Sequence, residues 1–124
     1  MLYLIRGWPG SGKTTKAKEL LKAGKIDVYY EADMFFESPV LGYTFDASKL
    51  WQAHAWCVRK TREALERGLN VAVSNTFIKL WELQQYIDLG FPYEIIECRG
   101  VYHNTHGVPV EKVISMRAKY EELK

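Results

Sequence analysis

Residues 7–14 read Gly7-Trp8-Pro9-Gly10-Ser11-Gly12-Lys13-Thr14 and match the pattern GxxxxGK[ST]. An apolar stretch typical of a buried strand (2–6) precedes the motif, and a helix-forming stretch (16–22) follows it. In this strand–loop–helix context the pattern forms a loop that binds phosphate groups. Glycines let the backbone approach the phosphates, while backbone N–H groups and the helix N-terminus offset their negative charge. The sequence therefore predicts a binding site for a nucleoside triphosphate.

Separate residues of this loop have separate expected roles. We expect Lys13 to contact the β- and γ-phosphates and the Thr14 hydroxyl to bind Mg²⁺. ATP and Mg²⁺ are thus the expected cofactors. The residues expected to bind the nucleotide are Gly7, Pro9, Gly10, Ser11, Gly12, Lys13, Thr14 and Thr15.

Length and composition indicate one folded domain over residues 1–124, because 124 residues with 48% hydrophobic and 26% charged side chains can bury a core. The net charge of +2 neither requires nor excludes a nucleic acid partner. No apolar stretch approaches the ~20 residues that cross a bilayer, and a strand and loop at the N-terminus leave no room for a signal peptide. We expect a cytoplasmic protein with no membrane partner; its oligomeric state is open.

Strand and helix patterns alternate four times along the chain. The expected strands cover 2–6, 28–32, 71–73 and 93–97, and the expected helices cover 13–23, 46–67, 80–87 and 109–122. This order predicts an α/β fold with a mainly parallel sheet of about four strands flanked by helices on both faces. Ligands of such sheets bind at the carboxyl ends of the strands. That rim should collect the phosphate loop, Asp33, residues 74–76 and the loop 99–108.

The long helix expected over 46–67 has an apolar stripe formed by Leu50, Cys57, Val58, Thr61, Ala64 and Leu65. His54 falls on this stripe, either as a hydrogen-bonded core residue or as a catalytic one. Trp51 and Trp56 lie off its centre. They either stack nucleic acid bases or pack against other helices, which is the commoner use of tryptophan.

Two groups of rim residues suit phosphoryl transfer. Asp33 ends the second strand, where a carboxylate takes a proton from an attacking hydroxyl, holds Mg²⁺ through water, or simply caps a turn. Cations that fold over a γ-phosphate stabilise its charge, although a solvated surface loop is the alternative. The candidates in or beside the loop 99–108 are Arg99, His103, Asn104 and His106.

Six stretches in a fixed order carry a family resemblance: RGWPGSGKT (6–14), ADMFF (32–36), GYTFD (42–46), AHAWC (53–57), VSNT (73–76) and NTHGVP (104–109). Together they span nearly the whole chain. They make the chain resemble the polynucleotide-kinase-like branch of P-loop kinases. The resemblance is strongest to the compact ATP-binding kinase module found in Nedd4-binding proteins and in phages.

The resemblance implies a three-layer sandwich of the P-loop kinase type and Mg-ATP-dependent phosphorylation of a hydroxyl, typically a nucleic acid 5′ end. It implies that Asp33 activates the acceptor and that the loop 99–108 is a lid over the phosphates. The implied catalytic residues are Lys13, Asp33, Arg99 and His106, and the implied metal-binding residues are Thr14 and Asp33. The implied acceptor contacts are Phe36, Tyr43, His54, Asn75 and Asn104.

Three positions depart from the family pattern. Ser74-Asn75 stand where relatives carry an aspartate, so Mg²⁺ is expected on Thr14, phosphate oxygens and water, helped by Asp33. His103 replaces an arginine of the lid, so Arg99 or His106 is expected to supply the charge. Phe36 stands where phage polynucleotide kinases have an arginine that binds the acceptor.

Three functions therefore stay open. The first is a kinase of nucleic acid 5′-hydroxyls. The second is a kinase of nucleosides, nucleotides or hydroxymethylated bases in DNA. The third is a nucleotide-binding module without transferase activity.

Overall fold

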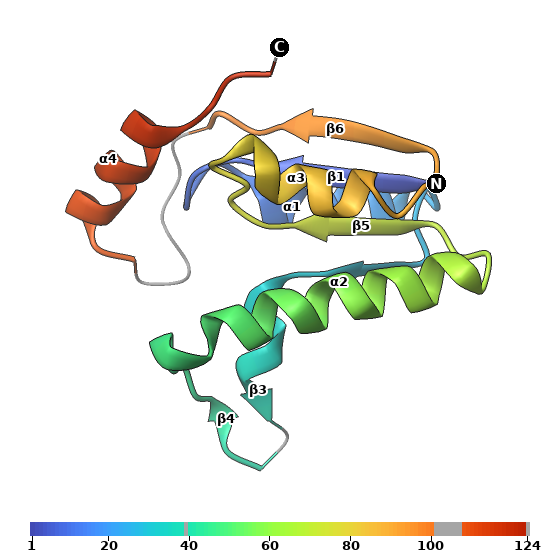
Figure 1. Cartoon of the computed structure of the whole chain (residues 1–124), viewed down its shortest axis with the longest axis horizontal. Helices are drawn as coiled ribbons and strands as arrows, with labels where there is room; N and C mark the ends of the chain where they lie inside the picture. The colour runs from blue at the N-terminus through green and yellow to red at the C-terminus, as the bar shows by residue number, and fades with distance from the viewer. Residues whose placement is uncertain (39, 101–107, 124) are drawn as a thin grey trace.

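A four-stranded parallel sheet forms the centre of the molecule (Figure 1), a computed structural model that describes residues 1–38, 40–100 and 108–123. Its strands are β1 (Leu2–Arg6), β2 (Val28–Tyr30), β5 (Val71–Ser74) and β6 (Tyr93–Glu97). They lie in the order β2-β5-β1-β6, and all three pairings are parallel. The predicted parallel sheet of about four strands is confirmed.

Helices cover both faces of the sheet because the side chains of β1 alternate between the faces. Ile5 packs with the buried side of α1 (Lys13–Lys22) on one face. Leu2 and Leu4 point to the other face, where α2 (Leu50–Glu66) and α3 (Leu80–Ile87) complete the larger core. This arrangement confirms the three-layer sandwich.

Strand β2 is shorter than predicted. It ends at Tyr30, and a 3₁₀ helix, η1 (Ala32–Phe36), follows, so Asp33 lies in this helix and not at the end of a strand. The backbone N–H of Ala32 donates to Asn75 Oδ1 over 2.9 Å, a bond that a continuing strand ladder would not allow. Beyond η1, two short strands that sequence analysis missed, β3 (Glu37–Ser38) and β4 (Gly42–Tyr43), form an antiparallel hairpin.

The helix predicted over residues 46–67 also begins later than predicted. Asp46 caps a short 3₁₀ helix, η2 (Ala47–Lys49), by accepting from Ser48 N, and α2 begins only at Leu50. Leu50 is exposed, whereas Ala53, which the predicted stripe omitted, is fully buried. The stripe is otherwise buried as predicted at Cys57, Thr61, Ala64 and Leu65.

The last helix, α4 (Val110–Lys119), ends before the predicted residue 122. The chain then runs back in extended conformation to the segment that follows β5. Glu121 N donates to Ile78 O over 2.8 Å, and Leu80 N donates to Glu121 Oε1 over 2.7 Å. In the part of the chain that the structure describes, no helix has the length and apolar character needed to cross a membrane.

Candidate functional site

The loop between β1 and α1 has the backbone that phosphate binding requires. Gly10 and Gly12 have φ angles of 81° and 98°, in the left-handed region that favours glycine. A Cβ at Gly7 would collide with Ser11 Oγ and the Cys98 carbonyl oxygen, so this position also needs glycine. The N-cap residue of α1 is Gly12, which has no side chain to cap the helix. The first N–H groups of this helix are therefore available to an anion, which fits a triphosphate.

Lys13 supplies the positive charge of this loop. Its Nζ donates to the Trp8 carbonyl oxygen over 3.0 Å. Burial lowers the pKa of Lys13 to about 8, although the charges of Glu31 and Asp33 act in the opposite direction. The side chain is thus charged at neutral pH and lies within the electrostatic reach of two carboxylates.

Glu31 is a residue of the site that sequence analysis missed. Its Oε1 accepts from the Thr14 hydroxyl over 3.1 Å, so a carboxylate adjoins the expected magnesium ligand. The predicted strand ran through residue 32 and hid Glu31 within it. The sequence signal that could have identified Glu31 is a carboxylate two residues before Asp33, at the rim of the sheet.

The oxygens of Thr14 and Glu31 suit Mg²⁺, which prefers hard oxygen ligands and keeps several waters. Within residues 1–38, 40–100 and 108–123, no cluster of three or more His, Cys, Asp or Glu side chains is placed to hold a metal. The protein therefore fits an ion that is completed by phosphate oxygens and water. Glu31 places a carboxylate beside Thr14, whereas residues 75–79, directly after β5, contain none.

Asp33 is oriented by the hairpin. The Tyr43 hydroxyl donates to Asp33 Oδ1 over 3.0 Å. Burial and this hydrogen bond raise the pKa of Tyr43 to about 12, so Tyr43 keeps its proton and remains a donor. The structure thus brings together Asp33, which was predicted to activate the acceptor, and Tyr43, which was predicted to contact it.

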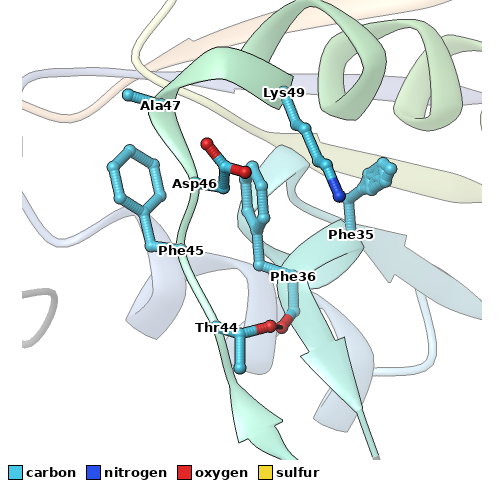
Figure 2. A pocket seen from close by; sticks show the side chains of 7 residues that line it. All are labelled: Phe35, Phe36, Thr44, Phe45, Asp46, Ala47 and Lys49. Atoms are coloured by element: carbon cyan, nitrogen blue, oxygen red, sulfur yellow. Dashed lines mark hydrogen bonds between the residues drawn. The ribbon is translucent and has the colours of Figure 1, made fainter.

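A groove of about 670 Å³ lies between η1 and the segment leading into α2 (Figure 2). Its lining residues are Phe35, Phe36, Thr44, Phe45, Asp46, Ala47 and Lys49. Phe36 is only 5% exposed, and its ring packs against those of Phe45 and Tyr43, with centroids 5.2 and 6.3 Å apart. Phe36 therefore holds the hairpin in place and presents little surface to a ligand.

His54 and Asn75, two further predicted acceptor contacts, line a second pocket of about 420 Å³ between α2 and α3. Asn75 also accepts from the backbone of Ala32, which places the pocket wall next to η1. Arg99 is engaged elsewhere: its guanidinium forms ion pairs with Glu97 and Glu122. His103, Asn104 and His106 lie outside the described residues, as does most of the expected lid.

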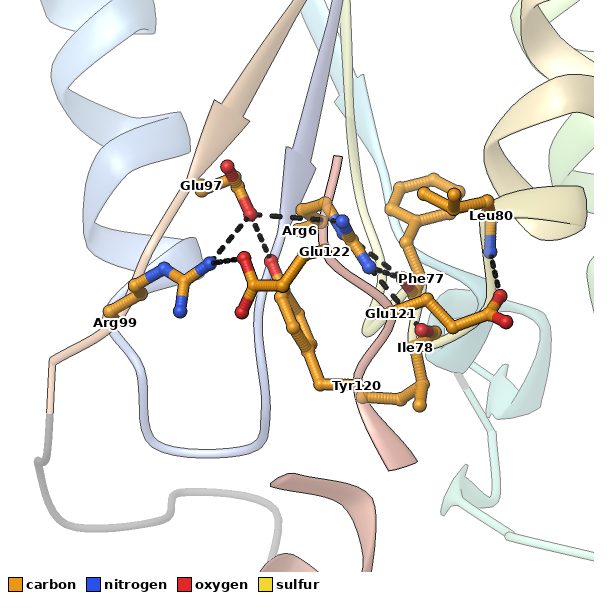
Figure 3. Close-up of polar contacts among 9 residues, drawn as sticks. All are labelled: Arg6, Phe77, Ile78, Leu80, Glu97, Arg99, Tyr120, Glu121 and Glu122. Carbon is orange, nitrogen blue, oxygen red and sulfur yellow. Dashed lines mark hydrogen bonds and ion pairs between the residues drawn. The ribbon is translucent and has the colours of Figure 1, made fainter. Parts of the chain in front are cut away.

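A cluster of side chains around Arg6 connects β1, which leads into the phosphate loop, with the segment that follows α4 (Figure 3). Arg6 is fully buried, donates to the Phe77 carbonyl oxygen over 2.7 Å, and lies 3.7 Å from a Glu97 carboxylate oxygen. The Tyr120 ring covers the Arg6 guanidinium at 3.9 Å and meets the Trp8 ring edge-on at 5.6 Å. Sequence analysis missed this cluster because its members are far apart in the chain.

Comparison with known proteins places these features in context. No family model matches the chain. It is 29% identical to human NEDD4-binding protein 2 over 99% of its own length, but it spans only 8% of that protein. This similarity supports the resemblance to the kinase module of Nedd4-binding proteins.

Solved structures show the same fold at low sequence identity. A sugar kinase from Janibacter sp. HTCC2649 has a TM-score of 0.71 and 18% identity, with 99% of this chain and 79% of that chain covered. A gluconokinase from Sinorhizobium meliloti 1021 has a TM-score of 0.68 and 15% identity, with coverage of 97% and 74%. A chain of the Pnkp1/Rnl/Hen1 complex has a TM-score of 0.63 and 19% identity, with coverage of 99% and 40%. The chain has the P-loop kinase fold.

Proposed function

We propose that this chain is an enzyme that transfers the γ-phosphoryl group of Mg-ATP to a hydroxyl of a nucleic acid, with a 5′ end as the preferred acceptor. One observation carries the proposal most directly. The carboxylate of Asp33, oriented by Tyr43, lies within electrostatic reach of Lys13 in the phosphate loop. A proton acceptor and a phosphate-binding cation thus share the rim where ligands of parallel sheets bind.

The loop residues hold and orient the nucleotide in this proposal. Backbone N–H groups at the start of α1 and the Lys13 ammonium bind the β- and γ-phosphates. Thr14 and Glu31 would hold Mg²⁺, which supplies positive charge to the phosphates when it is bound. Arg99 and His106 are the proposed cations of the lid, and Arg99 would have to leave its ion pairs with Glu97 and Glu122 to act there.

Asp33 acts on the acceptor. The acceptor oxygen attacks the γ-phosphorus, the bond from that phosphorus to the ADP oxygen breaks, and the hydroxyl proton passes to the Asp33 carboxylate. The hydrogen bond from Tyr43 to Oδ1 of Asp33 orients this carboxylate.

Incubation with γ-labelled ATP and a panel of acceptors tests the proposal. The panel holds a single-stranded DNA and RNA with 5′-hydroxyl ends, the same strands with 5′-phosphates, free nucleosides and nucleotides, and DNA containing hydroxymethylated bases. We expect label on the 5′-hydroxyl strands and none on their 5′-phosphorylated counterparts. Lys13→Ala protein prepared in parallel controls for contaminating kinases.

Other outcomes would contradict the proposal. Label confined to nucleosides or nucleotides would identify a kinase of monomers, and label on 5′-phosphorylated modified DNA would identify a base kinase. Tight binding of Mg-ATP with no labelled acceptor would identify a nucleotide-binding module.

A further inference from the structure

The pocket between α2 and α3 combines exposed aromatic rings with polar groups. Both helices begin at the edge of the sheet toward which the strand arrows point (Figure 1). The pocket lies beside the first turns of α2 and along α3. Its lining residues are Trp51, His54, Ala55, Asn75, Phe77, Trp81, Glu82, Gln85 and Tyr86. The volume of about 420 Å³ lies within the range of pockets that bind small molecules.

Two tryptophans are exposed to an unusual degree for this residue type. Trp51 on α2 is 78% exposed and Trp81 on α3 is 57% exposed. Trp56, which sequence analysis treated like Trp51, instead packs its ring against Tyr30 and Phe35. Core packing therefore accounts for Trp56 but not for Trp51 or Trp81, whose faces are open to a planar ligand.

The polar side chains of the pocket suit the edge of a nucleobase. Gln85 and Asn75 carry amides that each combine donors with an acceptor, and His54 adds ring nitrogens. Glu82 is fixed at the start of α3 by accepting from Lys79 N, and Asn75 is fixed by accepting from Ala32 N. Flat rings for stacking beside groups that hydrogen-bond along one edge are the features by which proteins bind unpaired bases.

The pocket adjoins the proposed site of chemistry. The Asn75 side chain that lines it is hydrogen-bonded to Ala32, the residue before Asp33. The first residue of the phosphate loop is also nearby, because Gly7 N donates to the Thr76 carbonyl oxygen over 3.2 Å. A base in this pocket would lie next to η1, which carries Asp33, the residue that the proposed function assigns to the acceptor.

We infer that this pocket binds a nucleobase of the phosphate acceptor, stacked on Trp51 or Trp81, with polar contacts from Gln85, His54 or Asn75. The inference rests on the proposed function, because it assigns the base-binding part of the same acceptor site.

Binding of a short single-stranded DNA with a 5′-hydroxyl, measured by fluorescence anisotropy in the presence of Mg-ADP, tests the inference. A second strand is identical but abasic at its first two nucleotides. We expect Trp51→Ala and Trp81→Ala, together or singly, to weaken binding of the intact strand by about 5-fold to 100-fold. The parent should bind the abasic strand with a similar loss, and the variants should bind it no more weakly than the parent does.

Tyr93→Ala is the matched control, because Tyr93 is an aromatic residue with 43% exposure at the opposite end of the sheet, where β6 begins. It should bind both strands as the parent does. Competition by free nucleosides against the intact strand distinguishes a monomer from a strand end as the source of the base. In either case the tryptophan variants should lose the base-dependent part of binding.

Equal binding of the intact strand by the parent and both tryptophan variants would overturn the inference. So would a loss seen only with Phe45→Ala, which would assign the base to the groove of Figure 2. Phosphoryl transfer measured on the same proteins separates the two claims. If phosphoryl transfer persists and the tryptophan variants bind the strand as the parent does, only the base-binding role of the pocket is refuted. If binding depends on the base but no phosphoryl transfer occurs, only the proposed function is refuted.

Discussion

At the scale of single residues, Lys13 is a buried cation whose protonation should control nucleotide binding. Because burial lowers its pKa to about 8, the free protein loses this charge above that pH. Bound phosphates favour the charged form, so binding takes up a proton in this range and weakens as pH rises. We expect the Kd for Mg-ATP to be nearly constant below about pH 7.5 and to rise up to about tenfold per pH unit above about pH 8. Isothermal titration calorimetry in two buffers would measure both the affinity and the proton uptake.

Lys13→Ala provides the comparison for this profile. Without the ammonium, phosphate charge is unmatched in a partly desolvated site, which should cost about 2–4 kcal/mol of binding free energy. The remaining affinity should not change across the same pH range. A parental Kd that stays constant to about pH 9.5, or a variant that binds as tightly as the parent, would contradict the role of Lys13.

Asp33 should affect chemistry far more than nucleotide binding. Asp33→Asn keeps the shape and still offers an oxygen to the Tyr43 hydroxyl, but an amide does not accept the acceptor's proton. We expect the transfer rate to fall by about 10²-fold or more with little change in ATP affinity, as measured by single-turnover transfer and equilibrium binding. Asp88→Asn, an exposed change where α3 ends, should leave both unchanged. Transfer by Asp33→Asn at the parental rate would rule out the general-base role.

At the scale of elements, the regular parts were predictable and their ends were not. The strands β1, β5 and β6 have apolar residues that local pattern identifies. Those of β1 and β5 are buried in the two cores, and Ile95 and Ile96 of β6 pack against them. The end of β2 depends on Asn75, which is 43 residues away from Ala32. Glu31 was missed for a similar reason: its contact with Thr14 is between distant parts of the sequence and forms only when β2 lies beside α1. The hairpin strands of two residues each are too short to have a period.

The segment after α4 is the part of the chain whose contribution to the free energy of unfolding is easiest to measure. Tyr120 covers the buried Arg6 guanidinium and donates from its hydroxyl to Glu97 over 2.7 Å. Tyr120→Phe keeps the ring and should cost about 1 kcal/mol of the free energy of unfolding. Tyr120→Ala also removes the contacts with Arg6 and Trp8 and should cost about 2–4 kcal/mol. Urea denaturation followed by circular dichroism would measure both, as a single transition if residues 1–124 form the one domain that we propose.

The Tyr120 experiment has an internal control. Tyr93→Ala removes an exposed aromatic ring that makes none of these contacts, and it should cost less than about 1 kcal/mol. Tyr120→Ala with the parental midpoint and slope would mean that the end of the chain adds nothing to stability.

The whole molecule carries little net positive charge to attract a polymeric acceptor. The net charge is only +2. Arg59 and Arg62 on α2 lie 3.8 and 3.9 Å from Glu63 and Glu66 of the same helix, which offsets much of their field. Arg99 is likewise engaged by Glu97 and Glu122. Affinity for a nucleic acid should then depend more on the bases than on the phosphates.

Salt dependence measures this balance. Each phosphate of a single strand that a protein neutralises contributes about −0.7 to the slope of log K against log salt concentration, because counterions are released. Two or three such contacts predict a slope of roughly −1.4 to −2 for an oligonucleotide acceptor. A nucleoside carries no phosphate, so its binding should hardly change with salt, and it should be the poorer substrate. Titrations of strand and nucleoside at several salt concentrations would test this. A steep slope, near −5, would contradict the expectation of two or three phosphate contacts, and faster labelling of nucleosides would favour a kinase of monomers.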